Sequence, residues 1–513
     1  MRTLLLSSFP RRGVARFGAA CLMTALLAGS VLASPIGVHP SKRYLTDASG
    51  KPVFFIGYYC WASVAPGYYN DSPQRYSDMI VKGAPYGINY LRFSLGINAL
   101  GGEGTNYWER DPTPIAFQYV NGKVDLDKWN PVFWSGLRYH AELARRNGVM
   151  LHVCLFDGVD YRGGTEKHRW INSFWNVKDQ VKDYYGDLDV NQDGNADENG
   201  EFYRANDFRN NTGVGRYQRK LIDKALAVTE GYDNVFFEIG NELLGSRADW
   251  NAAVIDYVKR NSGKIITQSG GRLAYNADGW CEHNPNSPAD VKKTLDGLVG
   301  RGCLFWLDPD GSDLMEASPD DLRRCVWYSF TGGAAGWGGF GDDYWERAFS
   351  LDTVTYHRNL AKFIKESGVK FWEMTPQHGL VSNNKVNSCL AKTSVEYVVY
   401  VLNDETVRVD LRDVTDSATY RLYDPKTGVW AEPQTVRGGA VQTFTKPPGA
   451  DDWVIHVRAV DLRGGAGGLR PSNRVAYGLE SLRSRYDDRR QPTVETFAVM
   501  GIGCRVMEPK ARR

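Results

Sequence analysis

The stretch Phe236-Phe237-Glu238-Ile239-Gly240-Asn241-Glu242-Leu243 is a short apolar run that leads directly into an Asn-Glu pair. It predicts a buried strand with two polar residues at its carboxyl end. Similar apolar runs lie on both sides of it, and amphipathic stretches typical of helices separate them. The runs are Val53–Gly57, Ile88–Phe93, Val149–Phe156, Val235–Ile239, Ile265–Thr267, Trp280–His283, Leu304–Leu307 and Ala334–Trp337. Eight strand–helix units in series favour an α/β fold, the (β/α)8 TIM barrel.

The helices expected between these runs carry their apolar residues on one face. In the helix expected over 125–147, that face comprises Trp134, Leu137, Ala141 and Ala144. Further helices are expected over 217–229, 322–330 and 354–366. An open, doubly wound sheet is the competing architecture. Because no GxGxxG motif follows the first apolar run, the sequence argues against a nucleotide-binding sheet of that kind.

The pattern changes to alternation with a period of two from about Glu373 onward. Turn residues such as Asp424-Pro425 and Gly438-Gly439 separate the alternating segments. These segments are Glu396–Val401, Thr406–Leu411, Thr419–Tyr423, Val441–Phe444 and Trp453–Val457. Short strands punctuated by turns predict a small all-β sandwich. The expected organisation is therefore a barrel over residues 34–372 followed by a sandwich over 373–457.

Both ends of the chain differ in composition from the part between them. The first 33 residues hold four arginines and no acid, then the apolar run Phe17–Leu32 and Ala33. This is typical of a signal peptide, so we expect export to the periplasm or the extracellular space, with an uncleaved anchor as the alternative. Residues 458–513 hold eleven Arg and one Lys against six acids. We interpret them as a poorly ordered basic tail, open to membrane or polyanion binding.

The formal net charge of the 513 residues is +2, but the basic ends account for it, and the body between them is net acidic. No nucleic-acid partner is expected from such a body, which suits a neutral glycan better than an anionic substrate. The seven cysteines left after signal cleavage are widely spaced and contain no CxxC pair. They predict neither a disulfide framework nor a zinc site, and leave open one bridge between Cys303 and Cys325.

The Asn241-Glu242 pair carries the strongest chemical signal. In a barrel, the carboxyl end of a strand faces the active site. A glutamate there can act as general acid and base, and the Asn241 amide can hold a sugar hydroxyl. The alternative interpretation is a polar dipeptide at the start of a surface loop.

The pair at the end of the fourth strand resembles the acid/base motif of clan A glycoside hydrolases, the retaining, cellulase-like barrels of the family five type. Other pieces match in the same order over residues 36–372. They are Arg92 after Asn89 on the second strand, Asp125-Leu126-Asp127-Lys128-Trp129-Asn130 before the second helix, Asp233-Asn234 before the fourth strand, and His283 near the sixth. The resemblance implies that Arg92 supports a nucleophile and that His283 lines the sugar site.

The sandwich resembles a collagen-binding-type domain that follows such barrels. Tyr423-Asp424-Pro425-Lys426-Thr427-Gly428 and Asp452-Trp453-Val454 carry the likeness. The name of that domain family is no evidence of collagen binding.

A retaining mechanism needs a second carboxylate about 5–5.5 Å from the first. The resemblance places a Glu at the end of the seventh strand, where this chain has Asp308-Pro309-Asp310-Gly311. Asp308 falls at the Glu position, Asp310 follows, and Glu316 is a lesser candidate. Because Asp is one methylene shorter than Glu, four alternatives stay open. The backbone at Asp308 approaches the sugar more closely, or Asp310 is the second carboxylate. Otherwise the site inverts the configuration through a water molecule, or it is inactive. Asp-Pro-Asp-Gly also suits a plain turn.

An insertion between the third and fourth strands contains the pattern DxNxDGxxD of EF-hand-type calcium loops. Its candidate ligands are Asp189, Asn191, Asp193 and Asp197. Gly200 occupies the twelfth position, where an EF-hand has a bidentate Glu, and Glu201 comes one place later. The pattern predicts a structural calcium ion that takes no part in the reaction. No cofactor is expected to be required for the reaction itself. A solvated acidic turn is the alternative.

Three tryptophans are expected at the barrel mouth. Trp61, Trp280 and Trp337 are candidate platforms, because sugar rings stack on indole, and core packing is the alternative for each. His152 lies in mid-strand and is expected to be a core residue with its hydrogen bonds satisfied.

The leading interpretation is an exported retaining glycoside hydrolase that cleaves β-glycosidic bonds in a polysaccharide or oligosaccharide by a two-carboxylate mechanism. No transmembrane segment is expected once the signal is removed. The alternative is a non-catalytic glycan-binding or adhesion protein on a decayed barrel.

Overall fold

The computed structural model describes most of the chain between residues 36 and 460. The described ranges are 36–47, 49–60, 72–95, 115–164, 169–197, 200–269, 274, 276–283, 285–298, 300, 302–309, 317–340 and 351–460. The expected signal peptide, most of the expected basic tail, Trp61, Asp310 and Glu316 lie outside these residues.

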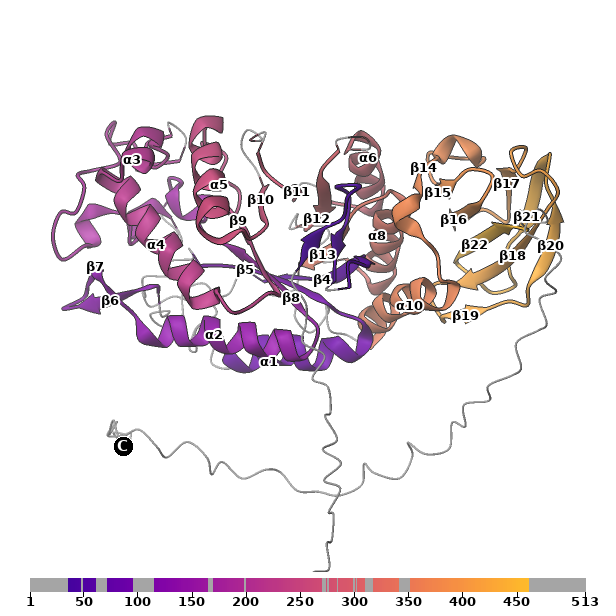
Figure 1. Ribbon diagram of the computed structural model, residues 1–513, viewed down its shortest axis with the longest axis horizontal. Helices are drawn as coiled ribbons and strands as arrows, with labels where there is room; N and C mark the ends of the chain where they lie inside the picture. The colour runs from indigo at the N-terminus through magenta and orange to yellow at the C-terminus, as the bar shows by residue number, and fades with distance from the viewer. Residues whose placement is uncertain are drawn as a thin grey trace, which may run out of the picture. The chain divides into compact units, whose positions relative to one another are not determined.

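Eight parallel strands close into a barrel (Figure 1). In chain order they are β4 (Phe55–Cys60), β5 (Tyr90–Ser94), β8 (Met150–Cys154), β9 (Val235–Glu238), β10 (Ile266–Ser269), β11 (Gly279–Glu282), β12 (Leu304–Leu307) and β13 (Gly336–Phe340). The last strand pairs with the first, so that Gly336 lies opposite Phe55. Each strand overlaps one of the eight apolar runs, and the predicted TIM barrel is confirmed.

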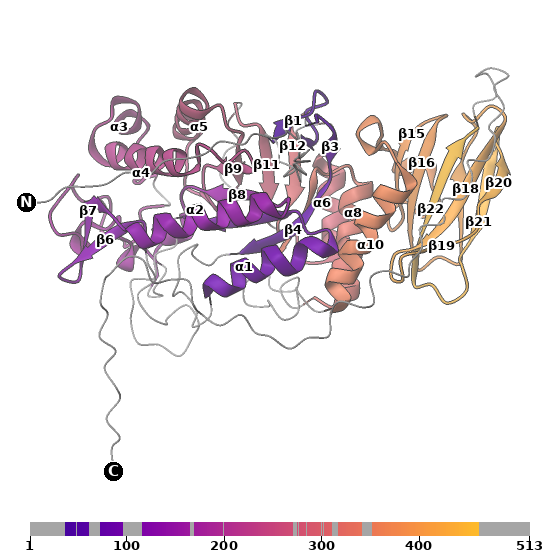
Figure 2. The ribbon, with the colours of Figure 1, turned by 60° about the horizontal axis from the view of Figure 1, so that its bottom comes forward.

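Helices follow the strands around the outside of the barrel. They are α1 (Ser72–Gly83), α2 (Pro131–Arg146), the short α3 (Ala205–Asn210), α4 (Gly213–Thr229), α5 (Ala248–Ser262), α6 (Pro288–Leu298), α8 (Pro319–Thr331) and α10 (Leu351–Ser367). Figure 2 shows α1 and α2 side by side along one flank. Among the described residues, no helix has the length and apolar character needed to cross a membrane.

The start of α2 differs from the prediction of a helix over 125–147. Residues up to Trp129 belong to β7 (Lys123–Trp129), which forms an antiparallel pair with β6 (Phe117–Val120). The helix begins at Pro131, and the side chain of Asn130 accepts a hydrogen bond from the backbone N of Val132 at 3.1 Å. An Asn cap followed by Pro is a strong signal for the start of a helix. This local signal, rather than the apolar period that extends further toward the N-terminus, sets the boundary.

The pleat of the strands separates two cores. Phe55, Tyr90, Phe236 and Trp306 are buried together inside the barrel. Their neighbours on the same strands point outward and pack against the helices. The small sheet β1 (Gly37–Val38), β2 (Leu45–Thr46) and β3 (Pro52–Val53) adds Leu45 to the inner core. The barrel is therefore filled by side chains, with polar groups confined to particular layers.

The residues after α10 form antiparallel sheets, as predicted. The strands are β14 (Thr375–Pro376), β15 (Ser388–Lys392), β16 (Glu396–Leu402), β17 (Thr406–Asp410), β18 (Ser417–Asp424), β19 (Val429–Trp430), β20 (Gln434–Arg437), β21 (Val441–Thr445) and β22 (Asp452–Ala459). The larger sheet has the order β14-β15-β16-β22-β18-β19, with β20 on β18, and β17 pairs with β21. All five alternating segments are strands, and their apolar faces share one core. The all-β sandwich is confirmed.

A buried ion pair joins the barrel to the sandwich. Arg323 of α8 lies 2.8 Å from Asp452 of β22, and both side chains are fully buried. Tyr400 donates a hydrogen bond to the same carboxylate at 2.6 Å, and its ring stacks on Trp327 of α8 with centroids 5.9 Å apart. Asn359 of α10 also donates to the backbone oxygen of Pro425 at 3.0 Å. Charge, stacking and backbone contacts thus fix the sandwich against α8 and α10.

The five cysteines whose side chains the structure describes form no disulfide. The bridge that the sequence left open between Cys303 and Cys325 is therefore absent.

Candidate active site

Arg92 of β5 is the centre of a polar cluster inside the carboxyl end of the barrel. Its Nε donates to Oε2 of Glu238 at 2.8 Å and its Nη2 to Oε1 at 2.9 Å. Burial alone would raise the pKa of Glu238, but the guanidinium lowers it to about 2, so this carboxylate is ionised. The same Nη2 donates to Oδ1 of Asn241 at 3.1 Å. Arg92 therefore ties the second strand to the end of the fourth.

The side chain of Asn241 is held from both sides. Its Oδ1 accepts from Arg92, and its Nδ2 donates to Oδ1 of Asp157 at 3.3 Å. Asp157 follows β8, and a parallel bridge joins its backbone to that of Asn241. The amide plane of Asn241 is therefore fixed before any ligand arrives.

Glu242 comes next and has a φ of 45°, in the left-handed region that a glutamate seldom adopts. Its side chain is 25 % exposed, whereas Asn241 is fully buried. Such strained backbone persists where the surroundings impose it, and functional sites are common places for it. The predicted acid/base residue therefore sits at the rim of the polar cluster, with access to solvent.

Arg162 is the ion-pair partner of Glu242. Its Nη1 lies 2.9 Å from Oε2 of Glu242, and its Nη2 donates to the Glu242 backbone oxygen at 2.7 Å. Burial works against the charge on Arg162, but Glu242 and Asp197 outweigh it and raise the pKa of the guanidinium. An arginine that stays charged thus holds both the side chain and the backbone of Glu242.

Asp308 directly follows β12 and is fully buried. Its Oδ2 accepts hydrogen bonds from Tyr90 at 2.8 Å, from the Trp306 indole at 3.1 Å and from the Cys281 thiol at 3.1 Å. Arg92 Nε is 3.7 Å away from the same oxygen. Burial raises the pKa of Asp308, and Arg92 offsets this in part. The structure therefore brings Asp308 into the cluster of Arg92, in a position closed to solvent.

The other oxygen of Asp308 faces a glycine. Oδ1 has no hydrogen-bond partner among the described residues. A Cβ atom on Gly338 would lie 1.7 Å from it, which no side chain tolerates. Gly338 of β13 is thus required for the present position of this carboxylate.

Asp157 is a buried acid with an unusual charge state. Burial raises its pKa to about 7, and the hydrogen bond from Asn241 offsets only part of that effect. One oxygen accepts from Asn241 and from the backbone N of Val159, while Oδ2 has no partner among the described residues. A carboxyl group whose pKa burial has raised well above its usual range therefore lies directly behind Asn241.

Two histidines border the cluster. His152 of β8 is fully buried, with Tyr90 Oη 2.9 Å from Nδ1 and Thr267 Oγ1 2.8 Å from Nε2. Burial lowers the pKa of His152 to about 3, so the ring is neutral, and the prediction of a satisfied core residue is confirmed. His283, just after β11, lies 3.5 Å from the Cys281 sulfur and packs edge-on to Tyr59. The Cys281 sulfur therefore contacts both His283 and Asp308.

The tryptophans predicted as sugar platforms need correction. Gly336 and Gly338 face the barrel interior, since added Cβ atoms there would meet Phe55 and Asp308, so Trp337 between them points outward. It is fully buried against the helices and offers no open face. Trp280 alternates in the same way with inward-facing Cys281 and is 9 % exposed. Neither indole lies on the inner face of the barrel.

The predicted calcium loop brings together three carboxylates. Oxygen atoms of Asp189, Asp193 and Glu201 lie within 4.8 Å of one another. Asp197, a predicted ligand, is placed elsewhere, because its oxygens accept from Tyr203 and from the backbone N of Gly245. The Asn191 side chain bonds to Asp193 within the turn.

Asp197 instead connects the loop to the Glu242 region. Its Oδ2 lies 3.7 Å from Nε of Arg162, the residue that holds Glu242. The backbone N atoms of Ala196 and Asp197 both donate to the carbonyl of Tyr161, at 2.8 and 3.1 Å. The acidic loop is thus part of the support for the rim.

Comparison with known proteins bears on this arrangement. The family described as "Putative collagen-binding domain of a collagenase" matches residues 376–458. No curated protein sequence matches the chain. Two similar solved structures are a glycoside hydrolase (14 % identity, TM-score 0.57) and a family 5 glycoside hydrolase from Bacteroides vulgatus (13 %, 0.59). Each alignment covers 83 % of this chain, and 97 % and 92 % of those proteins.

The chain has the fold of these glycoside hydrolases. At such low identity, the likeness to the glycoside hydrolases concerns architecture alone. The fold resemblance that the Asn-Glu pair and its companion motifs suggested is therefore confirmed.

Sequence reasoning missed several members of the cluster. Glu238 stands two residues before Gly240 in the quoted strand, but nothing in one sequence singled out a carboxylate that pairs with Arg92. Asp157 and Arg162 follow the third strand, and their position at a strand's carboxyl end was the available signal.

Proposed function

We propose that this protein is a retaining glycoside hydrolase that cleaves β-glycosidic bonds in a polysaccharide or oligosaccharide. The observation that carries the proposal is the fixed pair Asn241-Glu242 at the carboxyl end of the fourth barrel strand. Arg92 holds the first residue, and Arg162 holds the second at the solvent-accessible rim. Preorganised polar groups around an exposed carboxylate are what acid/base catalysis requires.

In this proposal, Glu242 protonates the glycosidic oxygen as the bond to the anomeric carbon breaks, and later takes a proton from the attacking water. Its carboxylate has to leave the ion pair with Arg162 and take up a proton from solvent before it can give that proton to the glycosidic oxygen. Asn241 presents an amide of fixed orientation to a sugar hydroxyl. Asp308 or Asp310 is the nucleophile that forms the glycosyl-enzyme. Asp308 has support from its contact with Arg92, and its burial requires that the surroundings of the carboxylate open on substrate binding.

Release of reducing ends from a panel of β-linked polysaccharides tests the proposal and names the sugar. Glu242→Gln keeps the shape of the side chain and removes its acid function, so turnover should fall by at least about 1000-fold. Glu230→Gln, at the exposed end of α4, is the matched control and should keep full activity. Activity of Glu242→Gln equal to that of the parent protein would overturn the assignment.

One observation favours a second candidate, a glycan-binding protein without turnover. The carboxylate at the end of the seventh strand is fully buried and accepts three hydrogen bonds, an arrangement that suits a core residue. In that case a glycan would bind to the parent protein and to Glu242→Gln equally, with no reducing ends released from any polysaccharide.

We also propose that the chain is exported and that Ca²⁺ stiffens the loop around Asp193. Arginines followed by an apolar run support export. Oxygen-only donors support a hard cation, and Oδ1 of Asp189 and Oε2 of Glu201 are buried without hydrogen-bond partners in the described part of the chain. The cation would act on rigidity and take no part in the reaction.

A further inference from the structure

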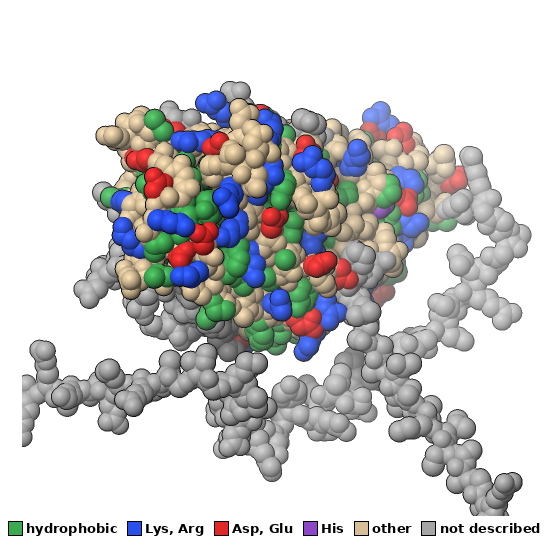
Figure 3. All heavy atoms as spheres, turned by 60° about the vertical axis from the view of Figure 1, so that its left-hand side comes forward, with side chains coloured by type: hydrophobic (Ala, Val, Ile, Leu, Met, Phe, Trp, Pro, Cys, Tyr) green, Lys and Arg blue, Asp and Glu red, His purple; other side chains and the backbone are tan. Residues whose placement is uncertain are grey.

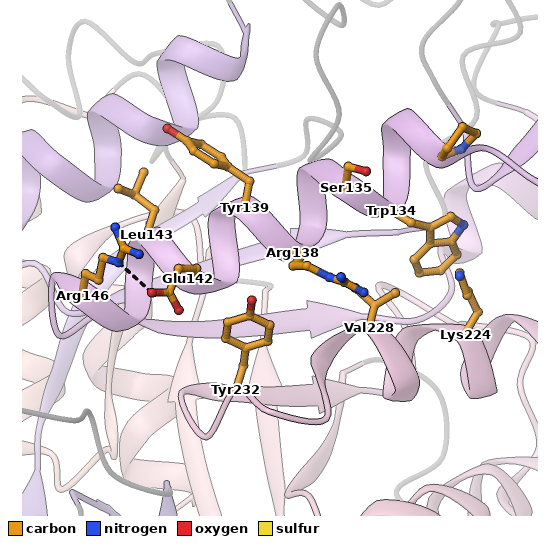
Figure 4. Close-up of a pocket in the computed structure, with 11 residues that line it drawn as sticks. Trp134, Ser135, Arg138, Tyr139, Glu142, Leu143, Arg146, Lys224, Val228 and Tyr232 are labelled. Carbon is orange, nitrogen blue, oxygen red and sulfur yellow. Dashed lines mark hydrogen bonds and ion pairs between the residues drawn. The ribbon is translucent and has the colours of Figure 1, made fainter. Parts of the chain in front are cut away.

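A groove runs between α2 and α4 on the outside of the barrel (Figure 4). Its volume is about 550 Å³. A second hollow of about 430 Å³ continues along α4 toward Trp129, and Lys224 borders both. We call these two hollows, which share Lys224 in their lining, the α2–α4 groove. Nothing in the proposed mechanism uses it.

The α2–α4 groove is basic although the body of the protein is net acidic. Among the described residues that line it, the cations are Arg138, Arg146, Arg216, Arg219, Lys220 and Lys224, and the acids are Glu142 and Asp223. Figure 3 shows Lys and Arg side chains gathered around hydrophobic ones on the flank of the barrel that carries α4.

The two acids of the groove are already engaged. Glu142 is neutralised by its own helix, 2.9 Å from Arg145 and 2.6 Å from Arg146. Asp223 accepts a hydrogen bond from Tyr257 at 2.7 Å. In the part of the chain that the structure describes, four of the cations pair with no carboxylate. They are Arg138, Arg216, Arg219 and Lys224. The groove therefore carries uncompensated positive charge.

The cations are regularly spaced. Arg216, Lys220 and Lys224 are four residues apart on α4, so they lie on one face at intervals of about 6 Å. Lys224 Nζ is held 5.9 Å from the ring centroids of both Trp129 and Trp134. Figure 4 shows Arg138 reaching across from α2 toward Val228 of α4. The result is a row of charges with one crossing from the opposite wall.

Aromatic rings border the α2–α4 groove. Tyr139 of α2 is 55 % exposed, and Tyr232 lines the groove beyond the end of α4 (Figure 4). A phenol ring offers a flat face to the CH side of a sugar. Cations beside such faces suit a ligand that is both cyclic and acidic.

We propose that the α2–α4 groove binds an anionic polysaccharide built of uronic acid residues, at a site separate from the Asn241-Glu242 pair. Such a chain carries one carboxylate on each sugar, which matches single cations spaced along a helix. A duplex nucleic acid carries its charge more densely, about one per 1.7 Å, than the cations of the groove are spaced. The choice of a sugar ligand also rests on the proposed function, because a second attachment point raises the local concentration of a hydrolase on a polymer.

Binding of polygalacturonate tests this site, with a neutral β-glucan and oligothymidylate as comparison ligands. All measurements use the full-length chain with Glu242→Gln, so that no result depends on hydrolysis. The groove variant adds Arg138→Glu and Lys224→Glu. The matched control adds Arg260→Glu and Lys365→Glu, which change the net charge equally at exposed positions of α5 and α10.

We expect the groove variant to weaken polygalacturonate binding at least 10-fold, and the control variant to weaken it less than 2-fold. Tyr139→Ala should weaken binding of polygalacturonate and leave any residual oligothymidylate binding unchanged. Equal losses in the groove and control variants, tighter binding of oligothymidylate, or no binding of polygalacturonate would overturn the proposal. Reducing-end release by the protein with Glu242 intact is measured separately, so failure of the proposed function is distinguishable from failure of the groove.

Discussion

Arg162 holds Glu242 at two points, through the carboxylate oxygen Oε2 at 2.9 Å and through the backbone oxygen at 2.7 Å. The second contact supports a backbone with a φ of 45°, which glutamate seldom adopts unaided. One guanidinium therefore sets both where the carboxylate lies and how the chain turns beneath it.

Arg162→Met should lower kcat about 10- to 100-fold and change KM much less, because a misplaced catalytic group slows the chemical step. Arg162→Lys should recover part of the loss, since an ammonium replaces the charge without the two-point contact. Steady-state kinetics on the substrate found in the polysaccharide panel measure both effects. Arg260→Met on the surface of α5 is the control, and an unchanged kcat in Arg162→Met would contradict the role.

Asp157→Asn should make the protein more stable at pH 8 than at pH 5, relative to the unchanged chain. Burial raises the pKa of Asp157 to about 7, above the 3.8 of an unburied carboxyl. Its contribution to stability is therefore fully present below pH 3.8 and is lost as the pH rises through 7. Asn carries no such cost and keeps an oxygen for Asn241. Urea unfolding at both pH values measures the difference.

The exposed carboxylate Glu230 supplies the comparison for that experiment. Glu230→Gln makes the same carboxylate-to-amide change at an exposed position, without the burial that affects Asp157. A gain for Asp157→Asn that is equal at both pH values would show that the buried carboxyl does not titrate as stated.

Gly338→Ala should destabilise the protein by about 3 kcal/mol, because its Cβ would overlap Oδ1 of Asp308 and press on the Tyr90 ring. Gly297→Ala in α6 is the opposite case. No atom lies within 4 Å of its Cβ position, and alanine favours a helix, so a gain of ~0.5 kcal/mol is expected. Unfolding midpoints of the two variants should move in opposite directions, and a loss in both would contradict the prediction.

Asp452→Asn should cost about 3 kcal/mol or more, because it leaves the buried Arg323 without its principal counter-charge. Asp451→Asn, one residue earlier, breaks only an exposed pair with Lys426 and should cost less than about 1 kcal/mol. Denaturant unfolding monitored by tryptophan fluorescence measures both. Similar losses in the two variants would show that burial of the Arg323 pair is not what matters.

Calcium should raise the melting temperature progressively as its concentration exceeds Kd, with a stabilisation of about 2.7 kcal/mol at one hundred times Kd. Asp193→Asn should abolish the rise, while Asp183→Asn, outside the carboxylate cluster, should retain it. Magnesium at the same concentration controls for ionic strength. A melting temperature that does not respond to Ca²⁺ or to a chelator would count against the site.

The barrel could be predicted from the sequence because its eight buried strands coincide with short apolar runs that amphipathic stretches separate. Asn241-Glu242 was visible because it directly follows one of these runs. Local signals also explain the misplaced start of α2, since the Asn130-Pro131 cap overrides the apolar period that extended the helix backward into β7.

What the sequence could not predict depends on groups that are far apart along the chain. Arg162 and Glu242 are 80 residues apart, and only the folded chain shows that they meet. Trp337 lies in a strand of glycines, so no alternation of side chains was available to show which way it points. Asp197 fitted the calcium pattern by spacing alone, yet Tyr203 and Gly245 occupy its oxygens.

The buried pair of Arg323 and Asp452 also constrains how such a protein can change by recombination. If the sandwich of a related chain replaced this one without an acid at the position of Asp452, the buried guanidinium of Arg323 would keep, among the described residues, only the partly exposed Asp320 as a carboxylate partner. The barrel and the sandwich are therefore expected to be inherited together. Exchange of the sandwich between related proteins should succeed only where both the arginine and the aspartate of the pair are present.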